Sequence, residues 1–140
     1  MSVGTSTLSR MFRGRLIAES LRLGADLAVP DLTLTRIGQR DVSSSTADSQ
    51  PNIWTIFDFE IPDYRADELA AQLARTLRPD GGWYADFRSD AEHVVVFAGK
   101  TFRYRIGDRD ALHEAQEYGR SVGVPDHQLD WEVVDPGPGE

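Results

Sequence analysis

The sequence predicts an α+β domain with a mostly antiparallel sheet and two main helices packed on one face of it. Three observations predict this class: strand-like segments in which apolar and polar residues alternate, two segments with helical spacing of apolar residues, and short turns between successive strands. The expected element order is β-β-α-β-β-β-α, with a further strand near the carboxyl end. A split β-α-β or ferredoxin-like arrangement is the nearest common type.

The first half of the chain contains three strand candidates. The segment 16–29 mixes apolar and charged residues without a clear period, so it predicts a short strand or irregular cover, and whether residues 16–40 join the main sheet stays open. Leu32 to Ile37 alternates strictly and predicts a half-buried strand. Residues 53–61 predict the strongest strand, and we expect it to be central because both of its faces are partly apolar.

An apolar stripe at helical spacing predicts the first helix. Asp63 can cap its start and Pro79 ends it. The stripe consists of Ala66, Leu69, Ala70, Leu73 and Leu77.

Three short strands follow as a meander over residues 83–88, 93–98 and 101–106, the last two joined by a two-residue loop, Gly99-Lys100. These loops set the expected pairing. They place Tyr84 opposite Phe97 and Phe97 opposite Phe102, and they place Asp86 opposite Val95 and Val95 opposite Tyr104. Both faces of the meander carry apolar side chains. We therefore expect helices on one face and the amino-terminal segment, or a second subunit, on the other.

The last helix runs from a cap at Asp108 or Asp110 to about Val122, and residues 128–134 are expected to add an edge strand. We expect a single domain over residues 11–134, with a mobile Ser-rich loop at 41–51 and disordered ends at 1–10 and 135–140. Met11 is an alternative start of the chain. The inner stripe of this helix consists of Leu112, Ala115, Gly119 and Val122.

Charge excludes some partners. The chain of 140 residues has a net charge of −8, and residues 51–140 carry most of the acidic excess. Such a surface repels phosphate backbones and anionic membranes, so we expect neither nucleic acid nor membrane as a partner. The amino terminus lacks the pattern of a signal peptide, and on that ground we expect the protein in the cytoplasm. Docking to a basic protein is the positive expectation from the same charge.

Several kinds of chemistry lack the residues they need. The chain has no cysteine, which excludes disulfides, Cys-type metal sites and thiol catalysis. The three histidines show no metal-ligand spacing, and there is no phosphate-binding glycine loop or nucleophile motif. We therefore assign no catalytic residue, no metal and no cofactor.

A group of polar and aromatic side chains is the best candidate for ligand or partner binding. Asp58 and Asp86 lie in strands that should be near each other, and a shared face would make them a carboxylate pair beside aromatic rings. The alternative is that each acid is exposed or bonded to an arginine or a tyrosine. The candidate residues are Trp54, Asp58, Tyr84, Asp86, Arg103, Tyr104 and Arg105.

Two functions follow from these features. The first is a non-enzymatic binding or interaction module, acting by self-association as a homodimer or by docking to a partner protein. The alternative is a small hydrolase or isomerase that uses Asp58 or Asp86 with a histidine.

The motifs of residues 52–133 resemble those of a family of small uncharacterised bacterial and archaeal α+β proteins. The resemblance implies a fold and no activity, and residues 1–50 lie outside it. The motifs are Gly82-Trp-Tyr-Ala-Asp-Phe87, Val94-Val-Val-Phe97, Gly99-Lys100-x-Phe102, Glu114-Ala-x-x-Tyr118-Gly119, Gly123-Val-Pro125 and Leu129-Asp-Trp131.

Overall fold

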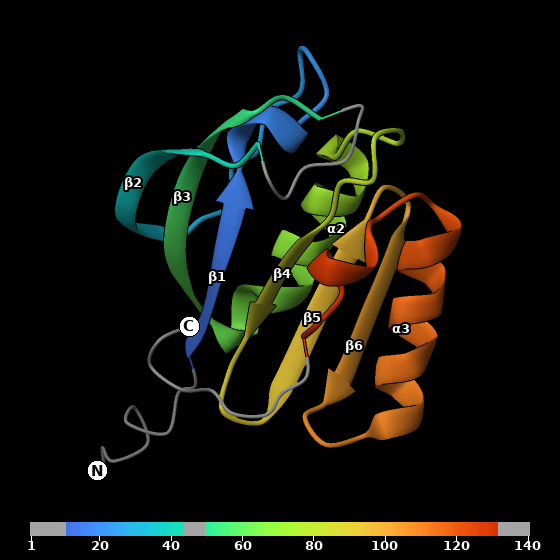
Figure 1. The fold of residues 1–140 in the computed structure, drawn as a ribbon. Coiled ribbons are helices and arrows are strands. Elements are labelled where there is room, and N and C mark those ends of the chain that lie inside the picture. The colour runs from blue at the N-terminus through green and yellow to red at the C-terminus, as the bar shows by residue number, and fades with distance from the viewer. Residues whose placement is uncertain (1–10, 44–49, 132–140) are drawn as a thin grey trace, which may run out of the picture.

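A computed structural model of the chain describes residues 11–43 and 50–131. It contains one six-stranded sheet in the order β2-β3-β1-β4-β5-β6, in which all neighbours are antiparallel (Figure 1). The α+β class with an antiparallel sheet is thereby confirmed. The expected ends at 1–10 and 135–140, and residues 44–49 of the expected loop, lie outside the described residues. The elements are β1 Met11–Ile17, η1 Ala18–Ser20, β2 Thr33–Asp41, β3 Ile53–Pro62, η2 Asp63–Arg65, α2 Ala66–Thr76, β4 Ala85–Arg88, β5 Glu92–Phe97, β6 Lys100–Arg105, α3 Arg109–Ser121 and η3 Asp126–Gln128.

A split β-α-β unit forms the middle of the sheet. Strand β1 pairs antiparallel with both β3 and β4, so those two strands run parallel to each other. Helix α2 connects them along the chain. Residues 16–40 therefore do join the main sheet, through the end of β1 and through β2.

Strand β1 is built from a narrow apolar row and a charged row. Phe12 and Leu16 are buried on one face, while Arg13 and Arg15 are exposed on the other. Gly14 lies between Phe59 of β3 and Phe87 of β4 in register. An added Cβ there would come within 2.5 Å of the Cβ of Phe87, so only glycine fits between the two rings.

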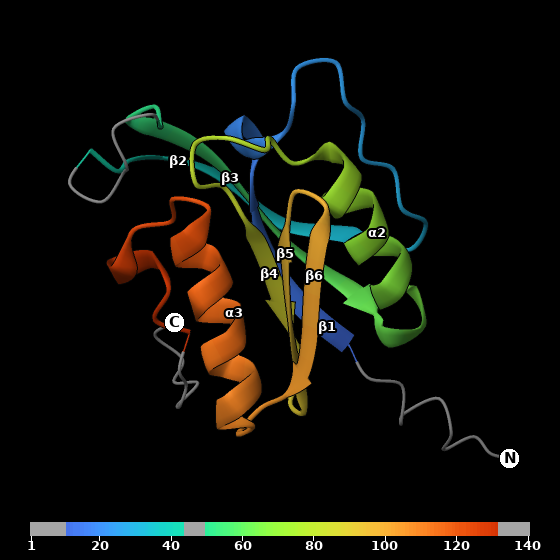
Figure 2. The same cartoon turned by 90° about the vertical axis from the view of Figure 1, so that its right-hand side faces the viewer.

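The two helices lie on opposite faces of the sheet, which corrects the expectation that both pack on one face (Figure 2). Helix α2 packs on the face that holds Phe87 and Val96. Helix α3 and the following segment pack on the face that holds Val95 and Phe97, but only over β4 to β6. The chain thus covers both faces of the meander by itself. The expected second subunit is not needed there.

The pairing of the meander is correct for its first hairpin and wrong for its second. Asp86 lies opposite Val95 as expected. Phe97 lies opposite Lys100, so the two-residue loop is Ala98-Gly99 and the register shifts by two. Val95 therefore faces Phe102 and not Tyr104. A shift by two keeps every side chain on its expected face.

Other local expectations need smaller corrections. Strand β2 exists but is an exposed edge and is not half-buried. Asp63 does not cap α2, because a turn of 3-10 helix, η2, precedes it. Asp108 does cap α3, accepting from the N–H of Ala111 at 3.0 Å. Residues 128–131 form no strand, and 132–134 lie outside the described residues. At the end of the expected mobile loop, Gln50 is buried and donates to the carbonyls of Gly81 and Gly82.

Candidate functional site

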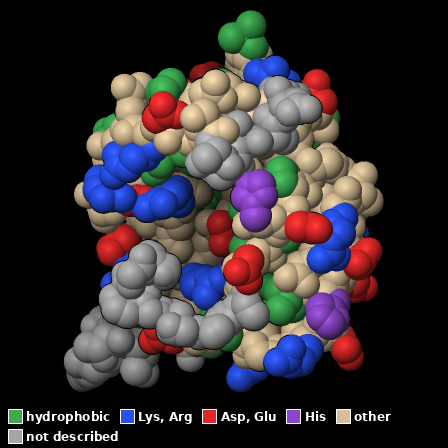
Figure 3. All heavy atoms as spheres, viewed as in Figure 1, with side chains coloured by type: hydrophobic (Ala, Val, Ile, Leu, Met, Phe, Trp, Pro, Cys, Tyr) green, Lys and Arg blue, Asp and Glu red, His purple; other side chains and the backbone are tan. Residues whose placement is uncertain are grey.

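Helix α3 leaves half of its face of the sheet open. Among the described residues no helix packs on this side of β1, β2 and β3 (Figure 2). The same surface in the space-filling view gathers basic side chains over these strands, next to a hollow in the surface (Figure 3). We call this surface the open face and define it by Arg13, Arg15, Ile17, Arg36, Arg40, Trp54, Ile56, Asp58 and Glu60, which share one side of the sheet by register.

A row of alternating charge crosses the open face. Arg36, Asp58, Arg15 and Asp86 lie opposite one another in register on β2, β3, β1 and β4. The row continues into Val95 on β5, where α3 covers the sheet. Charged residues therefore occupy the open part of the row and apolar residues the covered part, as the cost of burying charge requires.

Asp58 is the centre of this row. Its carboxylate accepts from Nε of Arg15 at 2.8 Å and from Nε of Arg36 at 3.0 Å, so it joins three strands. The hydrogen bond from Arg15 holds the pKa of Asp58 below its ordinary value, and the charges of Arg15 and Arg36 act in the same direction. A second pair in the next row joins Arg13 to Glu60 at 3.2 Å.

Asp86 lies on the same face as Asp58 but does not form a carboxylate pair with it, because β1 and Arg15 stand between them. Asp86 instead contacts Nε2 of His93 at 2.8 Å, and Nδ1 of His93 contacts the hydroxyl of Tyr104 at 2.8 Å. The side chain of His93 is only 1% exposed. Both ring nitrogens are thus engaged inside the layer under α3, where the ring links β4, β5 and β6.

The remaining candidate residues are dispersed. Tyr84 is partly buried against the carboxyl-terminal segment, where its hydroxyl donates to the carbonyl of Gln128 at 2.7 Å. Burial, together with the charge of Asp86, raises its pKa. Arg103 lies on the α2 side and bonds Glu92 and Asp67, and Arg105 is exposed on that same side. Those two arginines do not meet the acids of the site.

Trp54 is half-buried at the end of the open face. Its indole N–H donates to the carbonyl of Pro51 at 3.0 Å, and its ring lies 5.4 Å from that of Trp83. The face therefore ends in an aromatic group, which supplies contact area at low entropic cost.

The arginines of the open face were missed in the sequence. Arg13 and Arg15 stand two residues apart, as do Asp58 and Glu60, so each pair had to share one face of its strand. That spacing was the available signal. It would have indicated a charged face on strands whose other face is apolar.

Comparisons with known proteins found no match. No family model, no curated protein and no solved structure matches this chain. The described residues contain no cluster of three or more side chains suited to holding a metal ion. Within the same residues, no helix has the length and apolar character that crossing a membrane requires.

Proposed function

We propose that this chain is a non-enzymatic binding module that recognises an acidic segment of a partner protein through the open face. The observation that carries this proposal is the gathering of Arg13, Arg15, Arg36 and Arg40 on one surface that no helix of the described residues covers, in a chain with net charge −8. Arginine forks match carboxylates in geometry, and they are enriched in the parts of interfaces that matter most.

The arginines are held ready for binding. Side chains of Arg13, Arg15 and Arg36 are 75%, 51% and 53% exposed, yet each is oriented by a carboxylate of β3. Binding of a partner would therefore cost less side-chain entropy at these arginines than at arginines that move freely. The partly exposed side chains of Ile17 and Trp54 add apolar area beside the charges, so the surface can bind more than a point charge.

A pair of labelled peptides tests this proposal by fluorescence anisotropy. One is a short peptide of alternating Glu and Leu, and the other is its Lys and Leu counterpart. We expect the acidic peptide to bind more tightly, with an affinity that falls as salt is added. Preference for the basic peptide would support the opposite expectation, a basic protein partner, and would overturn this one.

Two double variants locate the binding. Arg36→Glu with Arg40→Glu changes the open face, whereas Arg75→Glu with Arg105→Glu makes the same change of net charge elsewhere. We expect the first pair to weaken binding of the acidic peptide by at least about tenfold, and the second pair to change it by less than about twofold. Equal weakening by both pairs would mean that net charge alone drives binding.

Self-association, the other expected mode of binding, finds support at a different surface. Strand β2 is an edge strand, and an open edge can pair with a second copy of itself. Leu34, Ile37 and Ile53 are 48%, 60% and 48% exposed beside this edge, on the side away from the open face. These features favour a homodimer through β2 over one through the meander.

The alternative of a hydrolase or isomerase has less support. Asp86 and His93 are in contact, as acid–base chemistry would need. However, His93 is buried, and its other ring nitrogen is hydrogen-bonded to the hydroxyl of Tyr104. Neither nitrogen is therefore placed to exchange a proton with a substrate. Asp58 is engaged by two arginines, which lower its pKa and make it a weaker base.

A further inference from the structure

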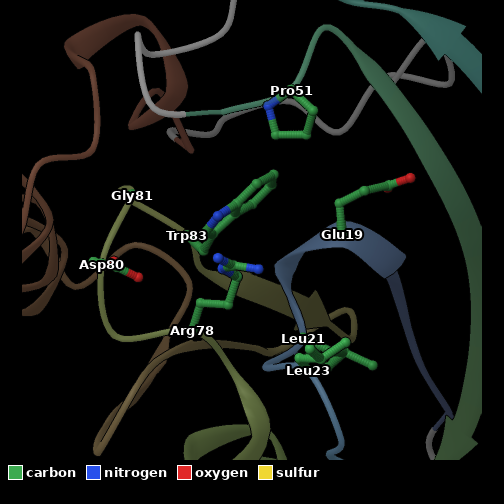
Figure 4. A pocket seen from close by; sticks show the side chains of 8 residues that line it. All are labelled: Glu19, Leu21, Leu23, Pro51, Arg78, Asp80, Gly81 and Trp83. Carbon is green, nitrogen blue, oxygen red and sulfur yellow. The ribbon is translucent and has the colours of Figure 1, made fainter.

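A second hollow lies at the end of the sheet where β1 ends, β3 begins and the chain approaches β4. Its volume is about 300 Å³, at the lower end of the range typical of small-molecule sites. None of its lining residues belongs to the open face, although it adjoins that face at Trp54, and a ligand bound here would act independently of the function proposed above. The lining residues are Glu19, Leu21, Leu23, Pro51, Arg78, Asp80, Gly81 and Trp83 (Figure 4).

The walls of this hollow are fixed by backbone contacts. The segment after η1 is bridged to the segment after α2 at Leu21 and Leu77. The N–H of Arg78 donates to the carbonyl of Ser20 at 2.8 Å. The indole of Trp83 is only 6% exposed and is backed by Trp54. The site is thus formed before any ligand arrives, which reduces the entropic cost of binding.

Two opposite charges line the hollow without meeting. Arg78 and Asp80 flank Pro79, and among the described residues neither side chain has a hydrogen bond or ion pair. Figure 4 shows the side chains of Arg78 and Asp80 among those that line the hollow. The third charged residue, Glu19, is already engaged, because its carboxylate accepts from the N–H of Thr55 at 2.7 Å and from its hydroxyl at 2.9 Å.

The rest of the lining is apolar. Leu23 is 96% exposed, so a large apolar side chain stands in water at the rim of the hollow. Leu21 and Trp83 continue the apolar surface inward. A ligand that covered Leu23 would remove apolar area from water, which is favourable.

We infer that this hollow binds a small zwitterion with an apolar side chain, that is, an apolar α-amino acid. The carboxylate of the ligand would pair with Arg78 and its ammonium group with Asp80. Its side chain would lie against Leu21, Leu23 and Trp83. This ligand class matches the two free charges in sign and number, and it leaves the engaged Glu19 undisturbed.

Leucine and two truncated analogues test the assignment by calorimetry or tryptophan fluorescence. Isocaproate lacks the ammonium group and isoamylamine lacks the carboxylate. We expect leucine to bind at least about tenfold more tightly than either analogue, because each analogue leaves one charge of the site unpaired. Equal binding of all three, or binding of none, would overturn the inference.

Variants then assign the two charges. Arg78→Gln should weaken leucine and isocaproate but leave isoamylamine unchanged, and Asp80→Asn should weaken leucine and isoamylamine but leave isocaproate unchanged. Arg75→Gln removes a nearby arginine outside the hollow and serves as the matched control. Both test positions are exposed, so the variants should fold, which circular dichroism checks. Loss of all binding in Arg75→Gln, or no selective loss in the other two, contradicts the assignment.

Discussion

Nε of Arg15 donates to Oδ1 of Asp58 at 2.8 Å and so joins β1 to β3 across the open face. Arg36 reaches the other oxygen of the same carboxylate from β2 at 3.0 Å. One acid therefore ties three strands together on a surface that no helix among the described residues covers.

Replacing Asp58 by Asn should destabilise the protein near neutral pH by about 0.5–1 kcal/mol, the range of partly exposed ion pairs. Because the folded pKa of Asp58 lies below its ordinary value of 3.8, its contribution is present above that value and is lost as the pH falls through the folded pKa. Urea unfolding at several pH values measures this. Asp90→Asn, in an exposed turn, is the control. A difference from wild type that stays constant into acid would contradict the role of the carboxylate.

Replacing His93 by Ala should cost about 2–4 kcal/mol, because the change leaves a cavity and removes the partner of both Asp86 and Tyr104. His93→Gln should cost less, since an amide can keep one of the two contacts. Chemical denaturation measures both variants. His113→Ala, on the exposed side of α3, should stay within about 0.5 kcal/mol of wild type. Equal losses at positions 93 and 113 would rule out the network.

Replacing Gly14 by Ala should destabilise by about 1–3 kcal/mol or more, because the new methyl group would overlap Phe87 and the carbonyl of Asp86. The matched control is Gly38→Ala on β2, where a Cβ meets only the flexible end of Arg40. We expect that variant to stay within about 0.5 kcal/mol of wild type. Thermal melts of the two proteins compare them directly. A stable Gly14→Ala variant would mean that β1 does not lie between the two phenylalanine rings.

Tyr84 should remain un-ionised while the protein is folded. Burial raises its pKa, so its contribution to stability is present below the ordinary value of 10 and is lost as the pH rises through the folded value. An alkaline titration followed by phenolate absorbance should therefore give the same number of phenolates for the folded wild type and for Tyr84→Phe. Near neutral pH the variant should lose about 1 kcal/mol with the bond to Gln128. An extra phenolate in the folded wild type would show that the ring is accessible.

If two copies pair through β2, Ile37→Lys should shift the protein from dimer to monomer in light scattering at high concentration. A lysine on an edge strand opposes pairing of two edges. Leu23→Lys adds the same charge at an exposed leucine outside β2 and should leave the dimer intact. A wild-type protein that is monomeric at every concentration would remove β2 as a self-association surface.

Sequence reasoning succeeded where local pattern decides structure. The apolar stripe from Ala66 to Leu77 can be buried together only on one face of a helix, and the alternation in residues 53–61 fits a strand. Both elements are confirmed. It failed for β1, because the buried face of this strand has only two large apolar side chains, Phe12 and Leu16, which alternate with glycine and arginines and give a weak pattern. The irregular segment was expected to begin at residue 16, so residues 11–15 were assigned no element and the charged face of β1 was missed.

The side of the sheet on which each helix packs could not be predicted, because it depends on how the connections cross and not on either helix alone. Alternation within each strand could not decide whether Asp58 and Asp86 share a face, because both their common side and their separation depend on the insertion of β1 between β3 and β4. The contact of Asp86 with His93 likewise could not be predicted from the local sequence pattern. It joins diagonal positions on two strands beneath a helix that comes later in the chain.

The position of β1 also constrains the order in which the protein can be assembled. This strand leaves the ribosome before β3 and β4, yet it pairs with both of them and lies between them in the sheet. Met11–Ile17 can pair with β3 once Pro62 has been made, but its other edge stays unpaired until Ala85–Arg88 follows. Until then the sheet of β1 to β3 and the meander of β4 to β6 cannot join. A tag or mutation that delays the insertion of these seven residues would therefore divide the molecule at its middle rather than fray one end.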